Sequence, residues 1–224
     1  MILYSIAHKV QAGMPWLWEI VEWGNSMIFS WQHGRDLRNM PQLLKNYQER
    51  LAVSEVHVQD CEKLAAFFNE QPEDAFIFFR PHEFDLKSLV KLTRRKSFLM
   101  FKVTDREKIV GYFFLRCFAN GSAFKGRMVD YRRRNLGIAK LMGVVINETV
   151  LTMGLRLYAT ISPQNYSSLA STQAVNDIKV VKVLENGCYY IECAPKKPDK
   201  GGGFINSIIK GLEWSCRRAY PYAI

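Results

Sequence analysis

The chain has 224 residues, 48% of them hydrophobic and 23% charged, which is the balance of an ordinary folded protein with a sizeable core. Lysine and arginine exceed aspartate and glutamate by 31 − 21, and the net charge of +10 favours anionic partners: a polyphosphate cofactor, nucleic acid or an anionic membrane surface. No apolar run reaches the ~18 residues of a membrane-spanning helix, and Lys9 and Gln11 interrupt the apolar first residues, so we expect neither a span nor a signal peptide.

Cysteine and histidine usage gives no sign of a disulfide framework or a metal site. The 5 cysteines are an odd number and form no Cys-x-x-Cys pair. The 4 histidines are scattered, and no pair has metal-ligand spacing. We therefore expect no bound metal and a reducing, cytoplasmic location.

Residues 1–52 are expected to form a helical N-terminal extension, broken at residues 13–15, 24–25 and 39–41 by glycine, asparagine and proline. Its tryptophans suggest an aromatic face that packs on the main domain. Two other interpretations are stacking on sugar rings and contact with a membrane interface. The extension holds four of the 5 tryptophans: Trp16, Trp18, Trp23 and Trp31.

From Val53 the pattern changes to alternating strands and helices. Residues 54–58 form a plausible short strand, and Asp60 is a candidate N-cap for a helix that ends near residues 71–74. Residues 75–79 are compact and aromatic, either a strand or a buried loop. A second short helix is expected over residues 86–92.

A hairpin follows, with strands over residues 97–103 and 109–116. Another turn leads into a strand over residues 122–129, which feeds a basic turn and then a helix with a stripe of apolar residues: Ile138, Leu141, Met142 and Val145. Such a strand, turn and helix point unpaired backbone N–H groups and the positive end of a helix at whatever lies above the turn. The expected guest is an anion, most plausibly a phosphate.

After that helix we expect a strand over residues 155–161 and a helix that begins at Ser162-Pro163. Residues 178–183 and 188–193 read as a closing hairpin around an Asn-Gly turn.

Two segments complete the chain. Residues 196–203 read as a flexible linker, and residues 204–224 contain a short amphipathic helix. This tail helix could dock on the domain, on the partner subunit of a homodimer or on a membrane surface, and docking on protein is the default.

The segment from Arg134 to Ala139 has the form Arg/Gln-x-x-Gly-x-Gly/Ala, and it resembles the pyrophosphate loop of the GNAT-type acyl-CoA N-acyltransferases. The order β-α-(α)-β-β-β-α-β-α-β-β over residues 53–195 is similar to the succession of elements in that family. The resemblance implies an α/β fold, an α+β mixed sheet of GNAT type, preceded by the helical extension.

What the resemblance implies about function is an N-acetyltransferase or other acyltransferase that uses acetyl-CoA or another acyl-CoA. Backbone groups around Val129 would pair with the pantetheine arm, Asn165 would contact its side, and one of three arginines would approach a phosphate. Backbone amides would cradle the pyrophosphate. The residues implied in these contacts are Arg132, Arg133, Arg134, Asn135, Leu136, Gly137, Ile138 and Ala139.

The sequence departs from the family pattern at the positions that usually supply proton transfer. The general acid is commonly a tyrosine where this chain has Thr172, and a carboxylate base found in some members falls on Ala123. Tyr166 is our first choice for the acid, with Tyr131 or Asp130 as substitutes. Water could also relay the proton, or activity could have been lost.

A small amine acceptor, and in particular an amino-sugar nucleotide, suits a basic protein with a tryptophan-rich helical extension. The alternative is a non-catalytic GNAT-like module that binds CoA or a partner. Nucleic-acid binding ranks last because no recognition element is present.

Overall fold

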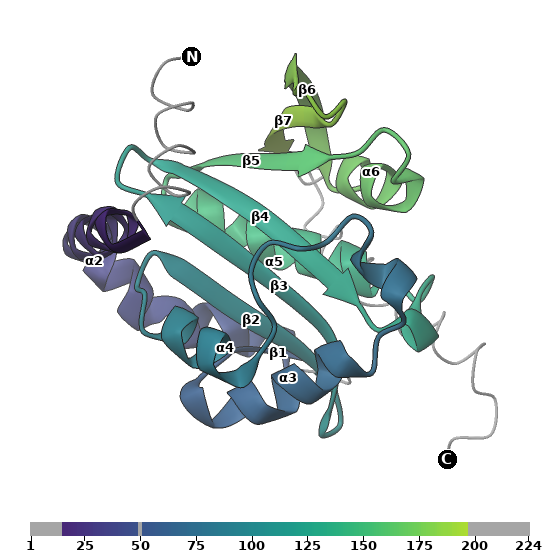
Figure 1. Ribbon diagram of the computed structural model, residues 1–224, viewed down its shortest axis with the longest axis horizontal. Helices are drawn as coiled ribbons and strands as arrows, with labels where there is room; N and C mark the ends of the chain where they lie inside the picture. The colour runs from purple at the N-terminus through teal and green to yellow at the C-terminus, as the bar shows by residue number, and fades with distance from the viewer. Residues whose placement is uncertain (1–14, 49–50, 197–224) are drawn as a thin grey trace.

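The computed structural model describes residues 15–48 and 51–196, and the predicted tail helix 204–224 and nearly all of the predicted linker lie outside them. The centre of the fold is a seven-stranded sheet in the order β1-β2-β3-β4-β5-β7-β6 (Figure 1). Every neighbouring pair is antiparallel except β4 and β5, which run parallel. This confirms the predicted mixed sheet. The strands are β1 (Leu51–Glu55), β2 (Phe98–Asp105), β3 (Lys108–Phe118), β4 (Ser122–Val129), β5 (Arg156–Ile161), β6 (Asn176–Val183) and β7 (Tyr189–Pro195).

Helices cover both faces of the sheet, and each face has its own apolar core. Short 3-10 turns join these elements: η1 (Lys45–Tyr47), η2 (Val58–Asp60), η3 (Glu73–Phe76) and η4 (Tyr131–Arg133). Helices α3 and α4 lie in front in Figure 1, and α5 lies behind. The helices are α2 (Pro15–Leu44), α3 (Cys61–Asn69), α4 (Leu86–Thr93), α5 (Ile138–Thr152) and α6 (Tyr166–Gln173).

Helix α5 buries the apolar stripe that its sequence predicts, from Ile138 to Val145. It packs unusually close to β3 at Gly111. A Cβ atom on that glycine would lie 2.1 Å from Cε of Met142, so the absence of a side chain is what allows the contact. The close packing fixes the beginning of α5 against the sheet.

The N-terminal half of the chain differs from the sequence prediction in three places. β1 begins at Leu51, so the expected boundary at Val53 falls inside a strand. Residues 75–79, expected as a strand or a buried loop, form the end of a 3-10 turn and a loop in which Ile77 and Phe78 are exposed. Helix α2 continues through the predicted breaks at residues 24–25 and 39–41, and it kinks instead at His33 (φ −116°, ψ 19°). Of the predicted break at residues 13–15, only Pro15 is among the described residues, as the first residue of α2.

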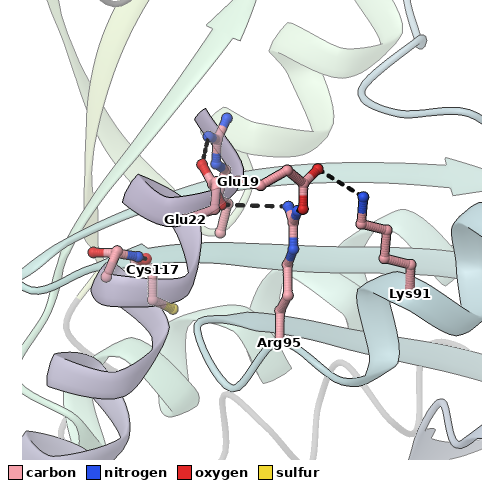
Figure 2. A network of polar contacts seen from close by, with 7 residues as sticks. Glu19, Glu22, Lys91, Arg95 and Cys117 are labelled. Atoms are coloured by element: carbon pink, nitrogen blue, oxygen red, sulfur yellow. Dashed lines mark hydrogen bonds and ion pairs between the residues drawn. The ribbon is translucent and has the colours of Figure 1, made fainter. Parts of the chain in front are cut away.

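Helix α2 stays helical past Gly24 because polar contacts to the domain hold it on both sides of that glycine. Glu19 and Glu22 point toward Lys91 and Arg95 at the end of α4 (Figure 2), with Glu19 Oε1 2.6 Å from Lys91 Nζ. The side chain of Asn25 bridges the end of β3 and the turn that follows it. It donates to the carbonyl of Cys117 and accepts from the N–H of Ala119, each at 3.0 Å.

The prediction that α2 buries an aromatic face is wrong for two of its tryptophans. The Trp23 side chain is 64% exposed and that of Trp31 is 86% exposed. The side of α2 that packs on the domain instead carries Glu22, Ser26 and the fully buried Phe29. Propensity and hydrophobicity alone did not indicate that the polar side would face inward.

Replacing Asn25 with alanine is expected to destabilise the protein by about 2 kcal/mol, because two partly buried hydrogen bonds are lost and their backbone partners remain. Chemical unfolding of the variant measures this change. Gln32→Ala, an exposed position of the same helix, is the control and should alter stability by less than about 0.5 kcal/mol. Equal effects in the two variants would contradict an anchoring role for Asn25.

Candidate acyl-CoA site

The only parallel pair of the described sheet, β4 with β5, holds together over a short distance. Ser122, Ala123 and Phe124 pair with residues 156–158, and no further pair continues the ladder. Beyond this point the two strands part, so the edge of β4 from Lys125 to Val129 keeps its β3 neighbour but has no paired strand on the β5 side. Parted strands leave backbone N–H and C=O groups that an extended ligand can pair with.

The loop that follows β4 is held firmly at its base. The backbone N–H of Asp130 donates to the carbonyl of Val110 (2.9 Å), and its carboxylate accepts from the N–H of Arg132 (3.1 Å). The N–H of Tyr131 donates to the side chain of Gln71 on the α3 side (3.0 Å). Asp130 is almost fully buried, so it supports the loop and is poorly placed to act as a base.

The loop ends in two left-handed residues before α5 begins. Asn135 has φ 63° and Gly137 has φ 78°. Gly137 is the N-cap of α5, and its carbonyl accepts the first intrahelical bond, from Leu141 at 3.0 Å. The N–H groups of Ile138 and Ala139 precede that bond and have no helical partner. This is a positively polarised concavity suited to a phosphate.

The three arginines of the loop differ in their surroundings. Arg132 pairs with Glu70 (3.2 Å) and lies over the Tyr131 ring, and Arg133 pairs with Asp105 (3.1 Å). Arg134 is exposed and forms no ion pair or side-chain hydrogen bond with any residue the structure describes. Among the three, Arg134 is therefore the guanidinium most available to an external phosphate.

Asn165 and Tyr166 lie at the beginning of α6, just after β5. The Asn165 side chain caps this helix by accepting from the N–H of Ser168 at 3.1 Å. Tyr166 is 76% exposed, and no partner for its hydroxyl is found within residues 15–48 and 51–196. The pair therefore combines a structural cap with a phenol that is free to reach a ligand.

The position expected to hold the family's tyrosine contains a buried threonine that binds an arginine. Arg127 on β4 donates to the hydroxyls of Ser171 (2.7 Å) and Thr172 (2.9 Å) on α6, and to the carbonyl of Ala139 on α5 (2.8 Å). Burial lowers the pKa of Arg127 to about 10. This guanidinium joins β4, α5 and α6 beside the parted strands.

Sequence reasoning missed both Arg127 and its neighbour on the same face, Lys125. The Lys125 ammonium nitrogen is buried and has no hydrogen-bond partner of acceptable geometry among the described residues. Burial lowers its pKa to about 8, only partly opposed by the Cys193 thiol on β7. The sequence signal that could have identified them is the presence of two basic residues at alternate positions of a strand, on a face where apolar residues are expected.

A histidine and a tyrosine interact on the opposite face of the sheet. His82 Nε2 lies 2.9 Å from the Tyr112 hydroxyl, and His82 Nδ1 lies 2.8 Å from the Glu83 carbonyl. Burial among aromatic rings lowers the pKa of His82. Both ring nitrogens of this largely buried histidine therefore have partners within the protein.

The described residues contain neither a candidate metal site nor a candidate membrane-spanning helix. No group of three histidine, cysteine, aspartate or glutamate side chains within residues 15–48 and 51–196 could hold a metal ion. None of the described helices has the length and apolar content needed to cross a bilayer.

A mixed sheet that parts at its parallel pair and leads into a loop before the amino end of α5 matches the class of fold implied by the sequence resemblance. No protein-family model and no curated protein matches the sequence. Solved structures do match. The GNAT domain of S. lividans PAT aligns with TM-score 0.56 and 16% identity over 63% of this chain and 89% of that one.

Two further structures give the same result. The ribosomal-protein-S5-alanine acetyltransferase from Vibrio fischeri aligns with TM-score 0.52 and 19% identity over 67% of this chain and 97% of that one. The PaiA N-acetyltransferase from Thermoplasma acidophilum, solved with coenzyme A, aligns with TM-score 0.55 and 12% identity over 66% and 100%. This chain has the GNAT-type N-acetyltransferase fold.

Proposed function

We propose that this protein is an acyl-CoA-dependent N-acyltransferase that moves an acetyl or other acyl group to the amine of a small acceptor. The observation that carries the proposal is the continuity between two features. β4 parts from β5 and runs directly into a loop whose left-handed residues, Asn135 and Gly137, lead into the amino end of α5. The parted edge of β4 suits an extended pantetheine arm, and the loop before α5 suits a pyrophosphate.

The residues present fit coenzyme A. The unpaired edge of β4 up to Val129 would bind the pantetheine arm, and the N–H groups from Arg134 to Ala139 would surround the pyrophosphate. Arg134 would contribute a free guanidinium. Arg132 and Arg133 already hold carboxylates, so we assign them to shaping the loop and not to direct phosphate binding.

Acyl-CoA, when bound, supplies a thioester carbonyl that a neutral acceptor amine can attack. The protein must then position the amine and supply a proton to the leaving thiolate, while the attacking nitrogen releases a proton to water. We assign that proton to Tyr166, because its phenol is exposed beside the carboxyl end of β5. Asn165 would orient it by fixing the first turn of α6.

We infer that the acceptor carries negative charge away from its amine, as an amino-sugar nucleotide does, since the net charge of +10 favours anions. A non-catalytic CoA-binding module is the second candidate. It is favoured by a buried threonine at position 172 and by Ala123, which is fully buried in the core where some members carry a base.

A thioester-cleavage assay separates these two functions. Acetyl-CoA is incubated with the protein and a panel of amines that includes amino-sugar nucleotides, polyamines and peptide amino termini. Release of CoA that depends on one amine supports the enzyme. Tight binding of acetyl-CoA without release for any amine would favour the module, and failure to bind CoA would contradict both.

Arg134→Ala is expected to weaken CoA binding about tenfold, because a charge-assisted contact to phosphate is removed while no contact inside the protein is lost. Calorimetric titration with CoA measures the change. Arg156→Ala is the matched control, an exposed arginine where β5 starts, beside the opposite end of β4 from the loop. Equal weakening in both variants would point to general electrostatics and not to a phosphate contact.

A further inference from the structure

The part of helix α2 before the kink at His33 presents a row of large apolar side chains to solvent, while Glu22, Ser26 and Phe29 are buried against the domain. At about 100° per residue, the exposed apolar positions fall on one side of the helix, opposite Glu22, Ser26 and Phe29. Each of these side chains is at least half exposed: Ile20, Val21, Trp23, Met27, Ile28 and Trp31. Large apolar side chains gathered on one exposed helix face mark a site of interaction.

No described part of the chain covers this face. A Cβ atom at Gly24, in the middle of the stripe, would meet nothing within 4 Å. On the opposite, inward side, Glu19 and Glu22 form ion pairs with Lys91 of α4 and with Arg95 just after it (Figure 2). The side chain of Asn25 adds two hydrogen bonds to the end of β3 and the turn after it. The outer residues are therefore not needed to attach α2 to the domain.

The charges beside the face indicate the kind of partner. The Glu19–Lys91 pair joins α4 to the first turns of α2, and α4 contains no acidic residue. Lys87, Lys91, Arg94 and Lys96 of this segment are exposed. A second copy docked on this face would add a second cationic surface close to the first, whereas an anionic bilayer would be attracted to it.

We propose that the outer face of α2, together with the basic residues of α4, docks on an anionic lipid bilayer. The exposed tryptophans suit this role because indole rings prefer the boundary between headgroups and acyl chains. Apolar insertion and attraction to anionic headgroups are two separate contributions, and peripheral binding needs both.

Docking through α2 leaves the proposed CoA loop open. Asn25 contacts the turn between β3 and β4, at one end of β4, and the loop from Asp130 to Gly137 lies at the other end. In Figure 1, α2 lies at the left of the molecule and the β4–α5 loop at the right. A bilayer at the α2 face would thus hold the protein with its loop directed away from the lipid.

Co-sedimentation of the full chain with vesicles tests the proposal. We expect binding to vesicles of phosphatidylcholine mixed with phosphatidylglycerol, and weak binding to phosphatidylcholine alone. A Met27→Glu/Trp31→Glu variant should bind at least about tenfold more weakly. Leu151→Glu, which changes an equally exposed apolar residue on α5, should bind like the wild type.

The electrostatic contribution has its own pair of variants. Lys87→Glu/Arg94→Glu should weaken binding to the mixed vesicles by roughly twentyfold or more, since each basic residue near an anionic surface contributes about fivefold. Arg156→Glu/Lys179→Glu makes the same charge change on β5 and β6 and should weaken it much less. Unfolding midpoints close to the wild type would show that all variants are folded.

Three results would overturn the proposal. The first is no binding of the wild type to mixed vesicles. The second is a dimer in analytical ultracentrifugation that Met27→Glu/Trp31→Glu dissociates, which would assign the face to a second copy. The third is protection of Trp31 from acrylamide quenching without vesicles, measured against Trp31→Phe, which would mean that another segment of this chain covers it.

Discussion

Gly137→Trp is expected to abolish the stabilisation of this protein by acetyl-CoA. In the wild type, ligand at a hundredfold excess over its dissociation constant should stabilise the folded state by about 2.7 kcal/mol. The variant should show no such shift, because an indole at the N-cap would fill the space in front of the unpaired N–H groups of α5. Thermal unfolding with acetyl-CoA, CoA, longer acyl-CoAs and ATP measures the effect.

The backbone conformation at this position calls for a matched control. Gly137 has φ 78°, so any side chain adds about 1–2 kcal/mol of strain whether or not a ligand binds. Gly121 has φ 75° and nothing within 4 Å of a built Cβ, and it lies in the turn at the other end of β4. Gly121→Trp should lower the midpoint similarly but keep the full shift with acetyl-CoA. Loss of the shift in both variants would refute a local role for the loop.

The site loop was predictable from sequence because each of its features has a local cause. A glycine at position 137 suits the left-handed conformation of the N-cap, and the spacing from Ile138 to Val145 predicts the buried stripe of α5. The order of elements around them resembles that of the GNAT-type acyltransferases, and this resemblance implied the mixed sheet that the structure has. Local patterns succeed here because they agree with the global fold.

The side of helix α2 that faces the domain could not be predicted from its own sequence. Its apolar residues were expected to face inward, but Glu22 and Asn25 find partners on β3 and α4 that are distant in sequence. A pattern read along one segment contains no information on those partners. The same limit applies to Arg127, whose role depends on hydroxyl and carbonyl groups from two other helices.

That Arg134 is the unpaired arginine of the loop could not be predicted from the sequence either. Three consecutive arginines read as equivalent, and only the positions of Glu70 and Asp105 distinguish them. Both carboxylates lie far earlier in the chain than the loop. The ion pairs therefore favour Arg134 among the three proposed phosphate contacts, a distinction that sequence spacing does not contain.

Lys125→Met is expected to stabilise the protein at pH 7 by about 3 kcal/mol. Burial lowers the pKa of Lys125 from 10.5 to about 8, and each unit corresponds to about 1.36 kcal/mol, so keeping the ammonium buried costs (10.5 − 8) × 1.36 kcal/mol. No ion pair offsets this cost, since the nitrogen has no partner of acceptable geometry among the described residues. Methionine has a similar shape and no charge to desolvate.

The sign of the pH dependence follows from the two protonation states. Below the folded pKa of about 8 both states carry the proton, and the cost is fully present. Between that value and 10.5 the unfolded state holds more protons, so the stability of the wild type rises with pH and the advantage of the variant shrinks. Denaturant unfolding at pH 7 and near pH 10 measures both effects.

Lys179→Met, at an exposed position of β6, is the control and should change stability little at either pH. A Lys125→Met variant less stable than the wild type at pH 7 would mean that the ammonium gains more from its neighbours, among them the Cys193 sulfur, than its burial costs. A variant that is more stable but slower in the proposed acyl transfer would mean that Lys125 contributes to activity at the expense of stability. Lys125 is the first residue of β4 past its last pair with β5, where a ligand arm would enter. A protein that keeps a destabilising charge there does so for a reason outside its own folding.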